Sequence, residues 1–126
     1  SETSIMAMRI RPEEAVQREI IVYLDAVLPR ALIMAIPNGA RRTRTGRASN
    51  AIAGLCPGAP DLVVALPGGK VLWIEVKAPN GHASSSQIAI HSAMKALGHT
   101  CVIARSQDDV RRALVRLGVE TREAMA

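Results

Sequence analysis

Two apolar runs separated by a short turn place the strongest constraint on how this chain can fold. Residues 61–66 read DLVVAL and residues 71–77 read VLWIEVK, with the turn PGGK between them. Short runs rich in β-branched residues on either side of a Pro/Gly turn are typical of a β-hairpin. The second run is unusual because Glu75 lies in its interior and Lys77 ends it. Burying either charge is costly unless the charge is paired or binds a metal.

The length of the hairpin loop decides whether a third charge joins this pair. With a three-residue loop at 67–69 and a glycine in the left-handed conformation, Asp61 faces Glu75 across the hairpin. The two carboxylates then lie within about 5 Å of each other, and Lys77 shares their face because strand residues two apart point the same way. A loop of two or four residues would place Asp61 on the opposite face unless a bulge corrected the register.

Two carboxylates and an ammonium group in this arrangement suit a divalent cation. Mg²⁺ prefers oxygen ligands and usually takes one or two carboxylates together with water and phosphate oxygens. A cation held by Asp61 and Glu75 would polarise a phosphodiester and acidify a bound water, which Lys77 could orient or deprotonate. The alternative is a surface Glu–Lys pair at the end of a strand. The apolar surroundings of Glu75 and a neighbouring basic loop favour the metal site.

That basic loop precedes the hairpin. Arg41, Arg42, Arg44 and Arg47 fall within seven residues, in a stretch rich in Gly, Thr, Ser and Asn and without an acidic residue among them. Guanidinium groups match phosphate oxygens, so this loop is predicted to hold a nucleic-acid backbone. The formal charge of +5 favours the same polyanionic partner. With one Trp, one Tyr and no Phe, the chain is expected to read backbone and shape rather than to stack bases.

The rest of the chain alternates helices with apolar runs. The predicted elements are a helix at 12–28, a strand at 31–36, the hairpin strands at 61–66 and 71–77, a helix at 84–97, a strand at 100–105 and a helix at 106–117. The strands at 31–36 and 100–105 are predicted to be buried, and 37–59 is predicted to be a long functional loop. The order α-β-β-β-α-β-α predicts an α/β fold with a small mixed sheet flanked by helices.

The same pattern defines one domain at 12–118, which we expect to follow a flexible leader at 1–11 and to precede a C-terminal tail at 119–126. No apolar run approaches the roughly 18 residues of a membrane span, and the N-terminus lacks the layout of a signal peptide. Cys56 and Cys101 are expected to be reduced thiols of a cytoplasmic protein. The three histidines have no second ligand at zinc spacing, so we interpret them as solvated or as neighbours of a site rather than metal ligands.

The sequence resembles a known nuclease family over about residues 12–117. Pro60-Asp61 followed by Glu75-Val76-Lys77 is similar to the PD-(D/E)xK nuclease signature. The fuller string GAPDLVVALPGGKVLWIEVKAPNG, then a helix containing Gln87, then CVIARSQDDVRRAL, resembles the VRR-NUC (virus-type replication-repair nuclease) branch. The resemblance implies an α-β-β-β-α-β core of the restriction-endonuclease-like type, Mg²⁺ or Mn²⁺ as cofactor, and hydrolysis of DNA phosphodiester bonds.

The resemblance also implies that the first helix supplies a glutamate to the site, and both Glu13 and Glu14 are candidates. Glu13 lies at the edge of the apolar stripe of that helix, whereas Glu14 points away from it. Glu13 also stands four residues before Gln17, a spacing associated with these nucleases. We therefore prefer Glu13, which would complete the metal shell together with the Val76 carbonyl.

Further expectations concern polar residues outside the hairpin and the partners of the chain. Gln87 resembles the helix glutamine of the family and would point toward the charged end of the hairpin. Asn38 and Arg42 could match polar positions in the loop before the PD strand and are assigned to DNA. Stand-alone members of this size resemble dimeric Holliday-junction resolvases of phage or bacterial origin, which implies branched duplex DNA and a homodimer. A nuclease for flapped or nicked duplexes and an inactive DNA-binding module on this fold are the alternatives.

Overall fold

The computed structural model describes residues 12–37, 41–42, 48–49 and 53–122, and for 41–42 and 48–49 it describes the backbone alone. The elements are α2 (Pro12–Val27), β1 (Leu32–Ala35), β2 (Arg41–Arg42), β3 (Ala48–Ser49), β4 (Leu62–Ala65), the 3-10 turn η1 (Pro67–Gly69), β5 (Val71–Val76), α3 (Ser85–Ala96), β6 (Thr100–Ala104) and α4 (Gln107–Arg116). The predicted order of helices and strands is confirmed. Two short strands, β2 and β3, are added within the stretch that was predicted as a loop.

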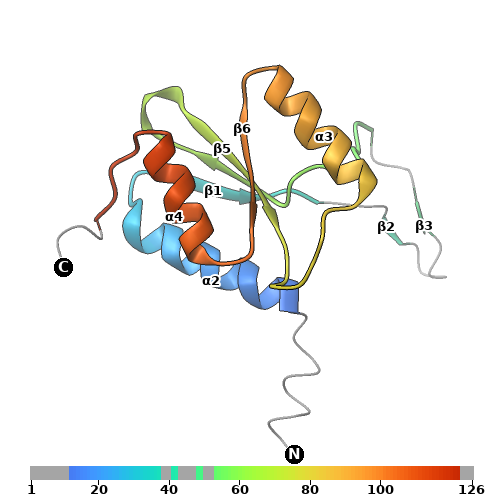
Figure 1. Ribbon diagram of the computed structural model, residues 1–126, viewed down its shortest axis with the longest axis horizontal. Coiled ribbons are helices and arrows are strands. Elements are labelled where there is room, and N and C mark those ends of the chain that lie inside the picture. The colour runs from blue at the N-terminus through green and yellow to red at the C-terminus, as the bar shows by residue number, and fades with distance from the viewer. Residues whose placement is uncertain (1–11, 38–40, 43–47, 50–52, 123–126) are drawn as a thin grey trace, which may run out of the picture.

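Four strands form one mixed sheet in the order β1-β4-β5-β6, and β2 pairs with β3 separately (Figure 1). β4 runs antiparallel to both of its neighbours, β1 and β5, whereas β6 runs parallel to β5. A parallel pair needs a crossover connection, and α3 provides it. The predicted architecture, a small mixed sheet flanked by helices, is therefore confirmed.

The hairpin of β4 and β5 has the predicted register. Leu62 lies opposite Ile74, and a backbone hydrogen bond of 2.8 Å joins the residues on either side of the loop. The loop therefore comprises the three residues Pro67–Gly69, and both of its glycines have a positive φ of 77° and 76°. This is the conformation that glycine adopts without steric cost. Continued by one residue, the register places Asp61 opposite Glu75.

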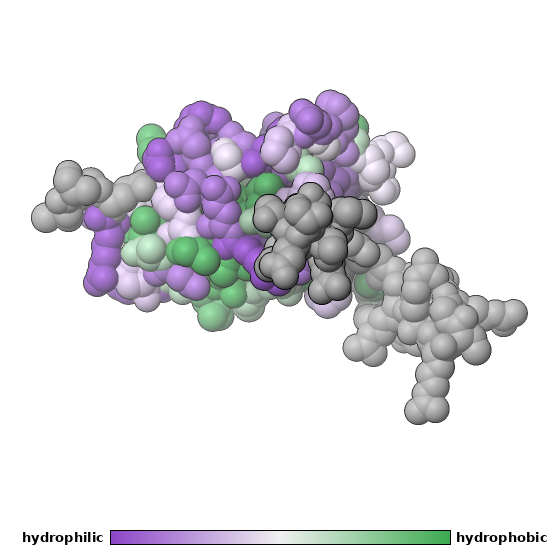
Figure 2. Space-filling view, turned by 90° about the horizontal axis from the view of Figure 1, so that it is seen from below, coloured by the Kyte–Doolittle hydropathy of each residue, from purple (hydrophilic) through white to green (hydrophobic). Residues whose placement is uncertain are grey.

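The core lies between one face of the sheet and the helices α2 and α4, which pack against each other. Alternate residues of β4 and β5 point into it, as the two-residue period of a strand requires. Its most deeply buried side chains are Ile20 and Leu24 of α2, Leu62, Val64, Leu72 and Ile74 of the sheet, and Val110 and Leu114 of α4. Figure 2 shows the molecule from below relative to Figure 1. On this face, polar side chains predominate and apolar ones form smaller patches between them.

The strands predicted to be buried at 31–36 and 100–105 are instead the two edges of the sheet. In β1, Leu32 is 59% exposed and Met34 is 40% exposed. In β6, only Ala104 is fully buried. The prediction of burial is wrong because an apolar run of this length does not reveal whether a neighbouring strand or a helix covers both of its faces.

The ends of the chain are described only in part. The predicted leader at 1–11 and residues 123–126 lie outside the described residues. Of the predicted tail, Val119 packs against the core, and its N–H donates to the Leu114 carbonyl at 3.0 Å. Among the described residues, no helix combines the length and the apolar character that crossing a membrane requires.

Candidate active site

Three carboxylates from three separate elements meet at one end of the sheet. Glu13 lies in the first turn of α2, Asp61 directly precedes β4, and Glu75 lies near the end of β5. One carboxylate oxygen of each lies within 4.8 Å of the others. Glu14 is exposed and pairs with Arg18 on the same helix at 3.3 Å. The structure therefore brings Glu13, rather than Glu14, to the pair of acids from the hairpin.

The backbone of the neighbouring strands holds Asp61 in place. Its Oδ2 accepts a hydrogen bond of 2.8 Å from the N–H of Val76, and its carbonyl accepts one of 2.8 Å from the N–H of Ile36. A hydrogen bond to an ionised carboxylate is stronger than one between neutral groups, so it fixes the side chain as well as the register. Val76 itself is buried beside this carboxylate.

Gly58 brings the loop before Asp61 against the first turn of α3. Its φ is 92°, and a Cβ on this residue would lie 2.5 Å from the carbonyl oxygen of Ser86. A real side chain never approaches a backbone oxygen so closely, so only glycine permits this contact. The contact sets the distance between the loop that carries Asp61 and the helix turn that carries Gln87.

Glu75 is the most buried charged residue in the described part of the chain, with no solvent-exposed surface. Its Oε2 accepts a hydrogen bond of 3.0 Å from Gln87 Nε2 and lies 3.6 Å from Lys77 Nζ. The Lys77 side chain is itself only 10% exposed. Among the described residues, the other oxygen of Glu75, Oε1, has no hydrogen-bond partner. One oxygen of the carboxylate is thus held, and the other is buried without a hydrogen bond.

The start of α3 orients Gln87. Ser84 caps the helix by accepting a hydrogen bond from the Gln87 N–H, and Gln87 Oε1 accepts one of 2.8 Å from the Ser84 N–H. This reciprocal capping box fixes which end of the amide faces the helix terminus. The amide NH₂ is left to point at Glu75. The residue that caps the helix therefore also holds the buried acid.

The surroundings of Glu75 favour its neutral form in the cation-free protein. Burial is the largest cause that raises the pKa of Glu75 from 4.5 to about 8, the neighbouring Asp61 adds to the rise, and the charge of Lys77 opposes it. A strongly raised pKa in a group of converging acids marks a candidate functional site.

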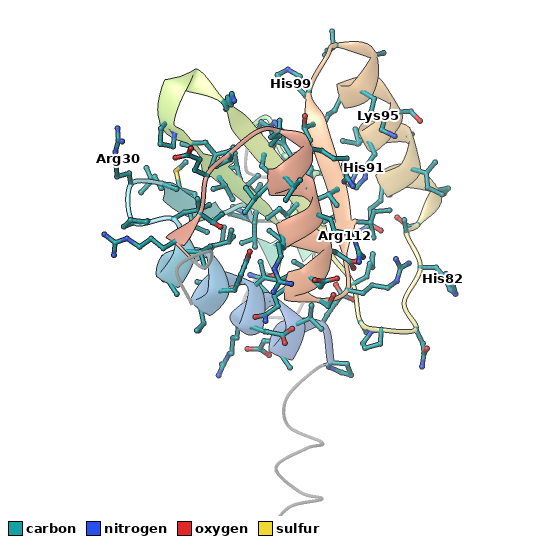
Figure 3. All side chains as sticks on the ribbon, turned by 60° about the vertical axis from the view of Figure 1, so that its left-hand side comes forward. Arg30, His82, His91, Lys95, His99 and Arg112 are labelled. Carbon is teal, nitrogen blue, oxygen red and sulfur yellow. The ribbon has the colours of Figure 1, made fainter. Side chains whose placement is uncertain are left out.

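His91 also contacts Glu75, which sequence reasoning did not assign. It lies on α3 one turn after Gln87, is buried, and places Nε2 4.0 Å from Glu75 Oε1. Figure 3 shows it between α3 and β6, whereas His82 and His99, both exposed, lie at the periphery. Burial is the largest cause that lowers the pKa of His91. The four-residue spacing from Gln87 was the signal available, because residues four apart share one face of a helix.

The predicted DNA-binding residues cannot be placed at this site. Asn38, Arg44 and Arg47 lie outside the described residues. Arg41 and Arg42 form β2, which pairs with β3, but only their backbone is described. Their role in holding DNA stays a prediction. An open groove at the first turn of α2 is lined by Pro12, Glu13, Glu14, Gln17 and Ala78, so one of the three acids borders it.

Three comparisons with known proteins each find a match. The VRR-NUC domain family model matches residues 3–108. A solved VRR_NUC domain structure is 25% identical, superposes with a TM-score of 0.58, and covers 83% of this chain and 95% of its own. "Putative nuclease p44" of Acyrthosiphon pisum secondary endosymbiont phage 1 is 43% identical over 51 residues, which is 40% of this chain and 55% of the phage protein. The match thus spans about half the length of that relative.

Proposed function

Because the chain belongs to the VRR-NUC domain family, we propose that it is a divalent-cation-dependent endonuclease that hydrolyses DNA phosphodiester bonds, with branched duplexes as its preferred substrate. The observation that carries this proposal is the convergence of Glu13, Asp61 and Glu75 within 4.8 Å. The ammonium group of Lys77 lies beside the most buried of the three. Three acids this close repel one another, and a bound cation would offset that repulsion.

The donor set fits Mg²⁺ or Mn²⁺. Both cations prefer carboxylate, carbonyl and water oxygens, and the three converging acids offer carboxylate oxygens. Glu75 Oε1 is buried without a hydrogen-bond partner among the described residues, and such an oxygen is costly until it gains a positive neighbour. We assign Glu13, Asp61, Glu75 and the Val76 carbonyl as the ligands. When bound, the cation would polarise the phosphate and acidify a water molecule.

The remaining residues of the site orient these groups. Gln87 holds the Glu75 carboxylate through a hydrogen bond of 3.0 Å, and the Val76 N–H holds Asp61. Lys77 lies next to the acids, where its ammonium group can position the attacking water or stabilise the charge that develops on the phosphate. Gln87 acts through Glu75, whereas Lys77 is assigned to the reacting atoms.

We assign the grip on DNA to the basic loop, with Asn38, Arg41, Arg42, Arg44 and Arg47 as its contacts to phosphate. The domain would extend over 12–118, and the groove beside Glu13 would admit the backbone of the strand to be cut.

A branched substrate gives a reason for a homodimer. One site of this kind cuts one strand, and a four-way junction needs two symmetric cuts, which a two-fold dimer supplies. We assign the interface to the β6 edge and the two helices beside it. Ile88 of α3 and Leu97, the residue that caps the C-terminus of α3, are 56% and 78% exposed, and Val115 of α4 is 71% exposed. Each is an apolar side chain that an interface would cover.

The test is cleavage of four matched substrates, namely a four-way junction, a flap, a nicked duplex and a linear duplex, each with Mg²⁺, Mn²⁺ or chelator. We expect cation-dependent cutting that is fastest on the junction. Faster cutting of the flap or of the nicked duplex would identify that structure, and not the four-way junction, as the preferred substrate. Binding of every substrate without any cleavage would identify an inactive DNA-binding module instead.

Lys77→Ala tests the assigned chemistry. We expect a loss of cleavage of about 100-fold or more with unchanged DNA affinity, because the lysine acts on the water rather than on the grip. Arg30→Ala is the control, since Arg30 is an exposed cation just beyond the C-terminal end of α2, whereas Glu13 lies in the first turn of that helix (Figure 3). Equal loss of binding and cleavage in Lys77→Ala would contradict this role.

A further inference from the structure

Two buried polar atoms face each other on the side of Glu75 away from Gln87. His91 Nε2 and Glu75 Oε1 lie 4.0 Å apart, and their side chains are 11% and 1% exposed. Neither atom has a hydrogen-bond partner in the described part of the chain. Because buried polar atoms are nearly always paired, two unpaired atoms at this distance call for a specific explanation.

The other oxygen of Glu75 already has its partners. Gln87 donates to Oε2 at 3.0 Å, and Lys77 Nζ lies 3.6 Å from the same atom. The separation of His91 from Oε1 is about 1 Å longer than an ordinary N–H···O hydrogen bond. A small rotation of either side chain would close that gap. His91 and Gln87 are one helical turn apart on α3, so one rigid element presents both groups to the two oxygens.

We propose that His91 is a positioning residue for Glu75, and that its imidazole N–H holds Oε1 when the carboxylate binds a divalent cation. A carboxylate has about four lone-pair sites, so bonds from Gln87 and His91 leave room for the cation. Hydrogen bonds from residues behind a metal ligand fix the orientation of that ligand and raise cation affinity. The inference rests on the proposed function, because it assigns His91 to the same cation site.

A histidine that only fills space beside Glu75 would tolerate different substitutions from one that donates a hydrogen bond to it. Leucine fills a similar volume without a hydrogen-bond donor, whereas glutamine can place an N–H close to the position of Nε2. A packing role is therefore kept by leucine, and a positioning role is kept by glutamine. Cation affinity separates the two roles, because it does not depend on turnover of DNA.

The experiment is calorimetric titration of the full chain with Mn²⁺ in the absence of DNA. Wild type, His91→Leu and His91→Gln are compared, and His82→Leu is the control for loss of an exposed histidine. We expect His91→Leu to weaken Mn²⁺ binding by roughly 10- to 100-fold. We expect His91→Gln and His82→Leu to stay near wild type. The cation-free melting temperature of each variant reports whether it is folded.

Three results would overturn the inference. Equal affinity of His91→Leu and wild type would show that the imidazole does not hold the carboxylate. Equal losses in the leucine and glutamine variants would show that shape alone matters. Absence of Mn²⁺ binding by the wild type would remove the proposed cation site itself, and the inference with it. If His91→Leu lacks a cooperative unfolding transition, His91→Met replaces it as the variant without a donor.

Discussion

Glu75 shows how a single buried residue can oppose the stability of the fold that contains it. It is buried, Lys77 Nζ lies 3.6 Å from its Oε2, and Asp61 adds a second negative group beside it. Removing a carboxylate from water is costly, and one lysine at this distance compensates only in part. The site is therefore held together by the rest of the fold, and not the reverse.

This strain predicts a pH dependence of stability in the cation-free protein. The pKa of Glu75 is 4.5 ordinarily and about 8 when it is buried in the fold. Between these values the folded state keeps a proton that the unfolded state has released, so the free energy of unfolding falls as the pH rises. We expect a loss of up to a few kcal/mol between pH 4.5 and pH 8. Urea unfolding in the presence of chelator measures it.

Glu75→Gln should remove this part of the pH dependence, because glutamine carries no titrating proton. Glu19→Gln, which changes an exposed glutamate of α2, is the matched control and should leave the slope as in wild type. A wild-type protein whose stability is constant from pH 4.5 to pH 8, or a Glu75→Gln slope equal to that of wild type, would contradict the raised pKa.

At the scale of elements, the contact between the loop at Gly58 and the start of α3 joins the two halves of the site. We expect Gly58→Ala to destabilise the fold, because a Cβ would lie 2.5 Å from the Ser86 carbonyl oxygen and the φ of 92° disfavours alanine. Overpacking of this kind costs about 1–3 kcal/mol, in addition to about 1 kcal/mol for the left-handed backbone. Chemical denaturation measures the loss.

Gly54→Ala separates the two causes. Gly54 has a φ of 79°, but a Cβ there would meet no atom within 4 Å, so this variant carries the backbone penalty alone. We expect Gly58→Ala to be the more destabilised of the two and to lose cation affinity as well, since the clash displaces the turn that carries Gln87. Equal effects of both substitutions would show that the contact with α3 has no role.

The hairpin and its acids could be predicted from sequence because they depend on local rules. The turn at Pro67–Gly69 has the chemistry of a three-residue loop, and that loop alone places Asp61 opposite Glu75. The helical period likewise places Glu13, and not Glu14, on the side of the site. Each step uses contacts between residues that are close in sequence or follow a fixed spacing.

The features that sequence did not reveal depend on how the elements pack. An apolar run at 31–36 is compatible with a central or an edge position, and the fold places β1 at the edge with Leu32 exposed. His91 is one of three histidines, and only the placement of α3 over the face that bears Glu75 distinguishes it from the others. Gly58 is equally ordinary in sequence, because its importance lies in a contact with Ser86.

At the scale of the whole molecule, the proposed dimer predicts which exposed apolar residues matter. Ile88→Glu on α3 should shift the mass measured by light scattering at micromolar concentration from that of a dimer to that of a monomer, because a buried charge disrupts an apolar interface. Val22→Glu is the matched control, since Val22 is 69% exposed on α2, a helix that is not assigned to the interface. A wild-type monomer that still cuts both strands of a junction symmetrically would contradict the dimer.

The three acids lie at positions 13, 61 and 75, on a helix, a loop and a strand that are distant in sequence. An unfolded chain therefore holds no cation, because gathering these groups requires closure of long loops. A cation that binds only the assembled site cannot guide the early steps of folding. It instead stabilises the native state and lowers the rate of unfolding. A bound cation would then slow unfolding and lengthen the lifetime of the native state. The turnover of the protein in a cell would therefore follow the local supply of metal.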